Sequence, residues 1–180
     1  LNLPGIPLKE IAKLLNSEEQ KVDLCVTEHL ACFLMPDVWA SMRLVEGKYF
    51  DLSAFLQDKT NRNIRIDKTQ LKDSVSRALL LLADKVQKPL VVQVAENKVT
   101  LEAATTAGEM SESINAVTEG ESGSLRIGYN PRYLMEILQA VEDETIDLSL
   151  GGANDPCLIK GMDYLSVLLP VSLGKTEAAL

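Results

Sequence analysis

The sequence predicts an α+β protein built from repeated β-α-β-β-β units, with helices on one face of antiparallel sheets. Two observations carry this prediction. Strand-turn-helix openings begin at Leu1, Ile64 and Leu125, so the same pattern recurs about every 60 residues. After each opening come runs of alternating apolar and polar residues separated by turn residues, which is typical of antiparallel strands.

The three openings share one short pattern, in which two apolar residues flank a polar residue. They read Leu1-Asn2-Leu3, Ile64-Arg65-Ile66 and Leu125-Arg126-Ile127. Because side chains alternate across a strand, this period of two predicts a half-buried strand at all three places.

Each opening continues into a predicted amphipathic helix. Thr69 is the expected N-cap of the second helix and Asn130 that of the third, while Pro7 and Pro131 fit a first helical turn. The predicted buried faces are Leu8, Ile11, Leu14 and Leu15 in the first helix, Leu71, Val75, Ala78, Leu79 and Leu82 in the second, and Leu134, Ile137, Leu138 and Val141 in the third.

Three strands are predicted after each helix. They are 22–26, 31–35 and 38–45, then 90–94, 98–105 and 109–117, then 145–150, 157–161 and 164–173, with turns at 95–98 and 151–154. One such unit leaves a sheet edge and an apolar helix face uncovered, whereas two units can share a sheet. Three units leave one unpaired, so we interpret the first as half of a domain whose other half lies upstream.

Composition narrows the class of protein. Apolar residues make up 46% of the 180, and no apolar run is long enough to cross a membrane. Three cysteines suit a reducing compartment, which predicts a cytoplasmic protein. The net charge of −8 opposes non-specific nucleic-acid binding over the whole surface, although it allows a local basic stripe. A start at Leu1 rather than Met indicates a processed or truncated product.

Three segments, in this order and at these spacings, carry a resemblance to a known family. They are RLVEGKYFDLSAFL at 43–56, SLRIGYNPRYLMEIL at 124–138 and DYLSVLLPVSL at 163–173. Together they resemble bacterial DNA sliding clamps, the beta subunit of DNA polymerase III. The chain departs from the family pattern at Phe50, where a proline is usual, and at Ala54 and Ser172, where basic residues are common.

The resemblance implies a DNA-clamp fold, in which 1–56 are the second half of clamp domain two with its connector and 57–180 are domain three. It implies a ring-forming processivity factor for DNA replication with no enzymatic activity and no cofactor, a homodimer when full length. Its partners would be duplex DNA, bound without regard to sequence, and the polymerase III catalytic subunit, the clamp loader, other polymerases and repair proteins, captured through QLxLF-like peptides.

The resemblance also implies residue roles. DNA-facing side chains would be Lys9, Lys13, Lys72, Arg77 and Arg132, although charges on exposed helix faces are often only solvated. The partner peptide would meet Phe50, Ala54, Phe55, Val167, Leu169, Pro170, Val171 and Ser172. Leu80 and Leu81, surplus to the buried stripe of their helix, would lie at a dimer interface or in a more deeply buried helix.

Two other functions stay open on the sequence alone. Cys25, His29 and Cys32 suggest either a zinc site or the cleft of a small intracellular α+β enzyme, but their spacing is not that of a structural zinc site and no fourth ligand is evident. The second is a clamp-like protein that binds peptides without closing on DNA. Gly174-Lys175-Thr176 ends like a phosphate-binding loop, yet Leu169 stands where that motif needs glycine.

Overall fold

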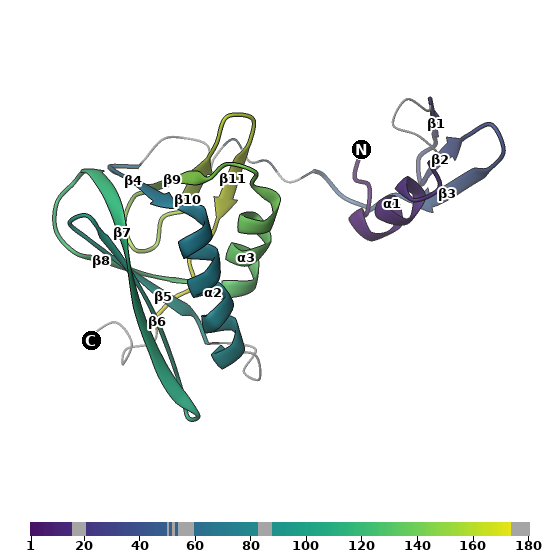
Figure 1. Ribbon diagram of the computed structural model, residues 1–180. Helices are drawn as coiled ribbons and strands as arrows, with labels where there is room; N and C mark the ends of the chain where they lie inside the picture. Colours follow the sequence, from purple (N-terminus) through teal and green to yellow (C-terminus); the bar gives the residue numbers. More distant parts are fainter. Residues whose placement is uncertain (16–20, 50, 52, 54–59, 83–87, 174–180) are drawn as a thin grey trace. The chain divides into compact units, whose positions relative to one another are not determined.

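The structure, a computed structural model, describes residues 1–15, 21–49, 51, 53, 60–82 and 88–173 (Figure 1). The chain divides into two compact units. Unit 1 covers Leu1–Leu52 and unit 2 covers Ser53–Leu180. Among the described residues, no helix combines the length and the apolar character needed to cross a membrane.

Unit 1 holds one helix and a small sheet. Helix α1 (Gly5–Ala12) precedes strands β1 (Asp23–Val26), β2 (Leu30–Leu34) and β3 (Trp39–Arg43), which pair antiparallel in that order. The strand predicted at 1–3 is wrong: this segment makes one backbone bond, from the Val45 N–H to the Asn2 carbonyl at 2.8 Å, and joins no sheet.

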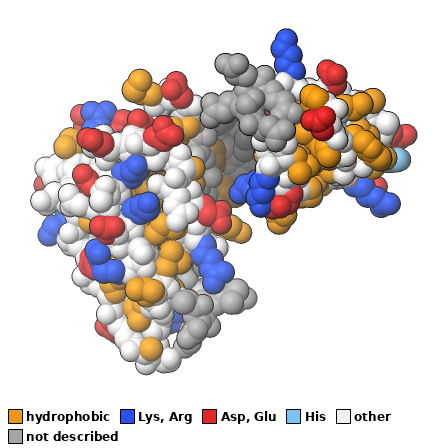
Figure 2. Space-filling view, turned by 45° about the vertical axis from the view of Figure 1, so that its right-hand side comes forward, with side chains coloured by type: hydrophobic (Ala, Val, Ile, Leu, Met, Phe, Trp, Pro, Cys, Tyr) orange, Lys and Arg blue, Asp and Glu red, His pale blue; other side chains and the backbone are white. Residues whose placement is uncertain are grey.

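The apolar faces of unit 1 are largely uncovered. Among its described hydrophobic residues, only Ala31 and Met42 are fully buried, on one face of the sheet. The helix ends at Ala12, so Leu14 and Leu15 follow it rather than extend its face, and both are exposed. Many hydrophobic side chains therefore lie at the surface of unit 1. Figure 2 shows them in orange on the unit that carries the single histidine, which is pale blue.

Unit 2 contains two complete β-α-β-β-β repeats. The first is β4 (Arg62–Asp67), α2 (Lys68–Leu82), β5 (Leu90–Ala95), β6 (Lys98–Thr105) and β7 (Gly108–Gly120). The second is β8 (Leu125–Tyr129), α3 (Pro131–Ala140), β9 (Thr145–Leu150), β10 (Cys157–Lys160) and β11 (Leu165–Leu168). The strand and helix order predicted for these two repeats is confirmed.

The two repeats share one antiparallel sheet in the order β11-β10-β9-β4-β7-β6-β5-β8. Strand β4 pairs with β7 of its own repeat and β9 of the other, while β8 pairs with β5 of the other repeat. Helices α2 and α3 pack side by side on one face of this sheet (Figure 1). The predicted placement of helices on one face is therefore confirmed.

One core lies between the helices and the sheet. Both repeats contribute to it, and its largest fully buried side chains include Ile64, Ile66, Leu71, Leu90, Leu101, Ile127, Leu138, Ile146 and Ile159. Burial of each such side chain contributes about 1.5–3 kcal/mol, so the core dominates the stability of unit 2.

Local signals explain where elements begin and end. The predicted turn at 95–98 is confirmed as a tight connection in which Asn97 adopts a positive φ of 52°, a conformation that asparagine tolerates. Asn130 caps α3, since its side-chain oxygen accepts from the Arg132 N–H at 3.0 Å.

The predicted N-cap of α2 is wrong. Asp67 caps this helix, because its Oδ1 accepts from the Gln70 N–H at 2.8 Å. Thr69 lies inside the first turn with an exposed side chain. The helix begins directly after β4, so the capping position falls on the last residue of the strand.

Replacing Asp67 by alanine should lower the free energy of unfolding by about 1 kcal/mol, because a first-turn N–H loses its acceptor. The matched variant Thr69→Ala should stay within about 0.5 kcal/mol of the parent. Urea unfolding followed by far-UV circular dichroism measures both. Equal losses in the two variants would contradict the assignment of the cap to Asp67.

Candidate functional site

The segment that follows β11 meets β8 at an isolated bridge between Val171 and Gly128. The Val171 N–H donates to the Gly128 carbonyl at 2.8 Å, which closes the sheet onto its far edge strand. Gly128 allows this approach, since a Cβ there would lie 2.6 Å from the Val171 carbonyl oxygen and 2.7 Å from Leu173 Cδ2. A backbone contact this close favours glycine over any side chain.

This closure presents apolar side chains at the surface. Leu169 is 52% exposed and Val171 38%, whereas Leu168, the last residue of β11, is buried. The strand predicted at 164–173 is wrong in extent, because β11 ends at Leu168. Pro170 has no N–H to donate to a ladder, which accounts for the early end.

The other predicted peptide-contacting residues are distributed as follows. Val167 and Pro170 are half-buried and Ser172 is exposed. All three are close in sequence to Val171, which forms the bridge with Gly128. Phe50, Ala54 and Phe55 lie outside the described residues. Sequence reasoning did not single out Gly128 or Tyr133, a 59%-exposed aromatic on α3, the helix that packs against β11. Both lie in the segment 124–138 that carried part of the resemblance.

The basic residues predicted to face DNA differ in their surroundings. Lys72 is half-buried on α2 and Arg132 is exposed in the first turn of α3, and neither has an ion-pair partner among the described residues. In unit 1, Lys9 is exposed and the Lys13 Nζ lies 2.7 Å from Glu10 Oε1. Only part of the predicted set therefore presents an unneutralised charge.

Arg77 is held by an acidic residue of the sheet. Its Nε and one terminal nitrogen donate to the two carboxylate oxygens of Glu112 on β7, each at 2.6 Å. The buried Ser74 hydroxyl donates to the same carboxylate at 2.7 Å. The Arg77 guanidinium and this hydroxyl lower the pKa of Glu112 below its ordinary value. The arrangement fixes α2 against β7 and balances the Arg77 charge locally.

Strand β7 has one open edge. Residues 108–115 pair with β6 on one side, and residues 116–120 pair with β4 on the other side, so among the described residues nothing pairs with the second edge of 108–115. Of the two leucines predicted at a dimer interface, Leu80 is 80% exposed, whereas Leu81 packs partly against the core. An exposed leucine and an unpaired strand edge both belong to the same helix-strand pair, α2 and β7.

The candidate metal or catalytic cluster in unit 1 does not converge on one cleft. His29 lines a pocket of about 650 Å³ with Glu28 and Arg43, and neither Cys25 nor Cys32 lines it. Within the described part of the chain, no three His, Cys, Asp or Glu side chains are grouped to hold a metal ion.

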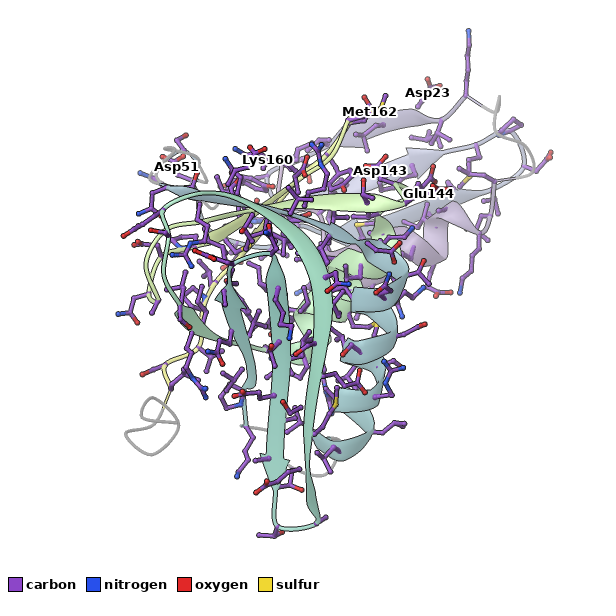
Figure 3. The ribbon with its side chains drawn as sticks, turned by 60° about the vertical axis from the view of Figure 1, so that its left-hand side comes forward. Asp23, Asp51, Asp143, Glu144, Lys160 and Met162 are labelled. Carbon is purple, nitrogen blue, oxygen red and sulfur yellow. The ribbon has the colours of Figure 1, made fainter. Side chains whose placement is uncertain are left out.

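A second, open pocket lies on unit 2, on the sheet region of β4, β9 and β10. It measures about 600 Å³ and is lined by charged groups, among them Asp143, Glu144 and Lys160 (Figure 3). The Arg65 guanidinium there binds both carboxylate oxygens of Asp147 at 2.8 and 2.9 Å, and this pairing lowers the pKa of Asp147. The lining holds three carboxylates, those of Asp143, Glu144 and Asp147, and two cations, Arg65 and Lys160.

Comparison with known proteins decides the family. The model for the C-terminal domain of the DNA polymerase III beta subunit matches residues 54–169. The chain belongs to the DNA polymerase III beta subunit family. Curated relatives called beta sliding clamps include one from Staphylococcus aureus, 25% identical over 173 residues, and one from Bacillus subtilis, 27% identical over 176 residues. Each alignment covers 94% of this chain and 46% of the relative, so the chain spans about half their length.

Solved structures give the same result for the fold. A putative DNA polymerase III beta subunit from Eubacterium rectale is 28% identical with a TM-score of 0.83, covering 94% of this chain and 46% of its own. The sliding clamp from Bacillus subtilis is 25% identical with a TM-score of 0.83, covering 96% and 46%. The predicted DNA-clamp fold and the resemblance to the second half of a sliding clamp are confirmed. The curated relatives carry the name beta sliding clamp.

Replacing Gly128 by alanine should destabilise unit 2 by about 1–3 kcal/mol, because the added Cβ overlaps the Val171 carbonyl. The Val171 amide should also exchange its hydrogen faster. Gly108→Ala is the control, since a Cβ there meets only the Leu81 side chain at an ordinary 3.7 Å. Urea unfolding and amide hydrogen exchange give the two readings, and unchanged protection at Val171 in Gly128→Ala would contradict the close-approach argument.

Proposed function

We propose that this chain is part of a processivity factor, a DNA sliding clamp that encircles duplex DNA and tethers replication and repair proteins to it. The observation that carries the proposal is the architecture of unit 2. Two β-α-β-β-β repeats share one sheet, and both helices lie side by side on a single face of it. That arrangement offers one helical face to DNA and leaves the sheet as an outer wall.

The DNA contact is proposed to be weak and directed at phosphates. Lys72 on α2 and Arg132 on α3 have no ion-pair partner among the described residues, so both are available to a phosphate. Phosphate contacts carry no sequence information, which suits a protein that must slide. Arg77 would contribute only after exchanging Glu112 for a phosphate. In unit 1, Lys9 on α1 and Lys13, the C-cap residue directly after α1, are the corresponding candidates.

Partner capture is proposed at the surface beside the Gly128 bridge. Leu169 and Val171 expose apolar area there, and Pro170 and Ser172 complete the segment. An exposed apolar strip beside β8 suits a short peptide with leucine and phenylalanine anchors, because a few buried anchors supply most of the affinity. Val167, half-buried on β11, is proposed to contribute to the site, whereas the predicted connector residues Phe50, Ala54 and Phe55 lie outside the described residues. The clamp loader and the catalytic polymerase would bind through such peptides.

Ring closure is proposed to use the open edge of β7 together with Leu80 of α2. A free strand edge is a template for pairing with another chain, and an exposed leucine on α2, the helix that packs against β7, adds apolar area. The uncovered faces of unit 1 support a second contact, with a further β-α-β-β-β repeat of the whole protein. On this proposal 1–56 belong to clamp domain two and 57–180 form domain three.

The runner-up function is a clamp-like protein that captures peptides without closing on DNA. The net charge of −8 and the neutralised Arg77 favour it, because both weaken attraction to a polyanion. Both functions predict peptide capture, so only a measurement of DNA binding distinguishes them.

The DNA role predicts that Lys72→Glu/Arg132→Glu weakens binding to a short labelled duplex at low salt by more than about fivefold, and lowers the slope of log K against log salt by about two. The control Lys48→Glu/Lys98→Glu makes the same charge change at exposed sites outside α2 and α3. Fluorescence anisotropy measures both. Equal weakening in the two variants would favour a non-specific effect of charge, and no binding by the parent would favour the runner-up function.

The peptide site predicts chemical-shift changes at the amides of Gly128, Leu169 and Val171 when the chain is titrated with a QLDLF peptide. Leu169→Asp should raise the Kd by about tenfold or more, because it places a charge where an apolar anchor binds. Val117→Asp is the control, since Val117 is 58% exposed on β7. Shift changes confined to other surfaces, or equal losses in both variants, would refute the assigned site.

A further inference from the structure

Two of the three cysteines are direct partners across a strand pair in unit 1. Strands β1 and β2 lie next to each other (Figure 1) and are joined by residues 27–29. They pair antiparallel, and their register places Cys25 opposite Cys32. Directly opposite residues in an antiparallel pair have Cα atoms about 4.5–5.5 Å apart and side chains on the same face. A disulfide needs a Cα separation of about 4.4–6.8 Å, so the register already supplies a suitable spacing.

Both thiols can be reached from solvent. Cys25 is exposed and Cys32 is half-buried. Ala31 and Met42, the buried residues of unit 1, lie on the opposite face of the sheet, because Ala31 is the neighbour of Cys32 along β2 and pairs with Met42 on β3. The cysteine pair therefore lies on the face that these buried residues leave to solvent.

We propose that Cys25 and Cys32 form an oxidation-sensitive dithiol that closes into a cross-strand disulfide when the protein meets a hydroperoxide. The inference rests on the strand register of unit 1 and does not depend on DNA or peptide binding. It assigns to the pair a modification chemistry rather than the metal or catalytic roles considered for it from sequence.

The chemistry proceeds in two steps. The Cys25 thiolate, the more exposed of the two, attacks one oxygen of the hydroperoxide; the O–O bond breaks, the sulfur becomes a sulfenic acid, and water or an alcohol leaves. The Cys32 sulfur then attacks the sulfenic sulfur, forming the S–S bond and expelling water. The two thiols lose two electrons and two protons in total, and the peroxide takes them up. An external dithiol reverses the reaction by thiol–disulfide exchange.

Cys157 is an internal reference for this reaction. It lies on β10 in unit 2, 2% exposed, and burial raises its pKa to about 12. A buried thiol with so little thiolate reacts slowly with oxidants and alkylating reagents. The folded chain is therefore expected to have two reactive thiols and one inert thiol.

A disulfide between Cys25 and Cys32 would stabilise unit 1 more than a comparable disulfide would stabilise unit 2. The described part of unit 1 has few buried apolar residues, so its small sheet has little core to hold it together. A covalent link between β1 and β2 restricts the unfolded chain and fixes the register of the hairpin. Oxidation would thus favour the ordered state of this sheet.

The test treats the 180-residue chain with hydrogen peroxide, blocks remaining thiols with iodoacetamide after unfolding, and maps the peptides by mass spectrometry. The expected product has Cys25 linked to Cys32 in one chain, Cys157 alkylated, and full reversal by dithiothreitol. The result that overturns the proposal is alkylation of both Cys25 and Cys32 at peroxide doses that oxidise other residues, or linkage of either to Cys157 or to a second chain.

A matched variant separates strand register from simple nearness along the chain. In Cys25→Ser/Val26→Cys the two thiols stay close in sequence but lie on opposite faces, because Val26 pairs with Ala31. Under native conditions this variant should form its disulfide about tenfold more slowly than the parent, since the thiols are no longer oriented toward each other. In strong denaturant the two proteins should react at similar rates. Equal native rates would show that the hairpin register does not promote closure, and would overturn the proposal.

Discussion

The structure of unit 2 depends on strand pairing between its two repeats. Strand β4 pairs with β9 along six residue pairs, and β8 pairs with β5 along five, so each repeat completes its sheet with a strand of the other. Because these pairings place Ile64 and Ile66 beside Ile146 and Leu148 under α2 and α3, one exchange of strands creates both the continuous sheet and the single core. A repeat without such a partner keeps its apolar faces uncovered, as unit 1 does.

Strand pairing also positions the surface proposed to bind partner peptides. Strand β4 lies between β7 and β9, and β8 has an equivalent place, with β5 on one side and the Gly128–Val171 bridge on the other. The absence of a side chain at Gly128 lets the chain after β11 approach β8 closely. As a result Leu169 and Val171 lie next to β8 but remain exposed.

Charges on the helical face serve two purposes that compete. The bidentate contact between Arg77 and Glu112 fixes α2 against β7, and it also removes one cation from the set available to a phosphate. Lys68 is likewise used within the fold, since its Nζ donates to the Val141 carbonyl at 3.0 Å and joins the start of α2 to the end of α3. On the proposed function, a face that keeps only some of its cations free would make few phosphate contacts, and weak contacts suit a protein that slides.

The sequence by itself determined the repeat, the order of its strands and helices, and the family, because apolar periodicity, turn residues and the segments at 43–56, 124–138 and 163–173 are local signals. It misplaced the cap of α2, since Asp67 and Thr69 both suit an N-cap and only the register of β4 decides between them. It extended the last strand to 173 and began the chain with a strand at 1–3, because strand pattern does not reveal whether a pairing partner exists. Only the tertiary structure decided the interleaving of the two repeats, the capture of Arg77 by Glu112, the different burial of Leu80 and Leu81, and the opposition of Cys25 and Cys32. Each of these depends on contacts between residues distant in sequence or on strand register, which no local pattern specifies.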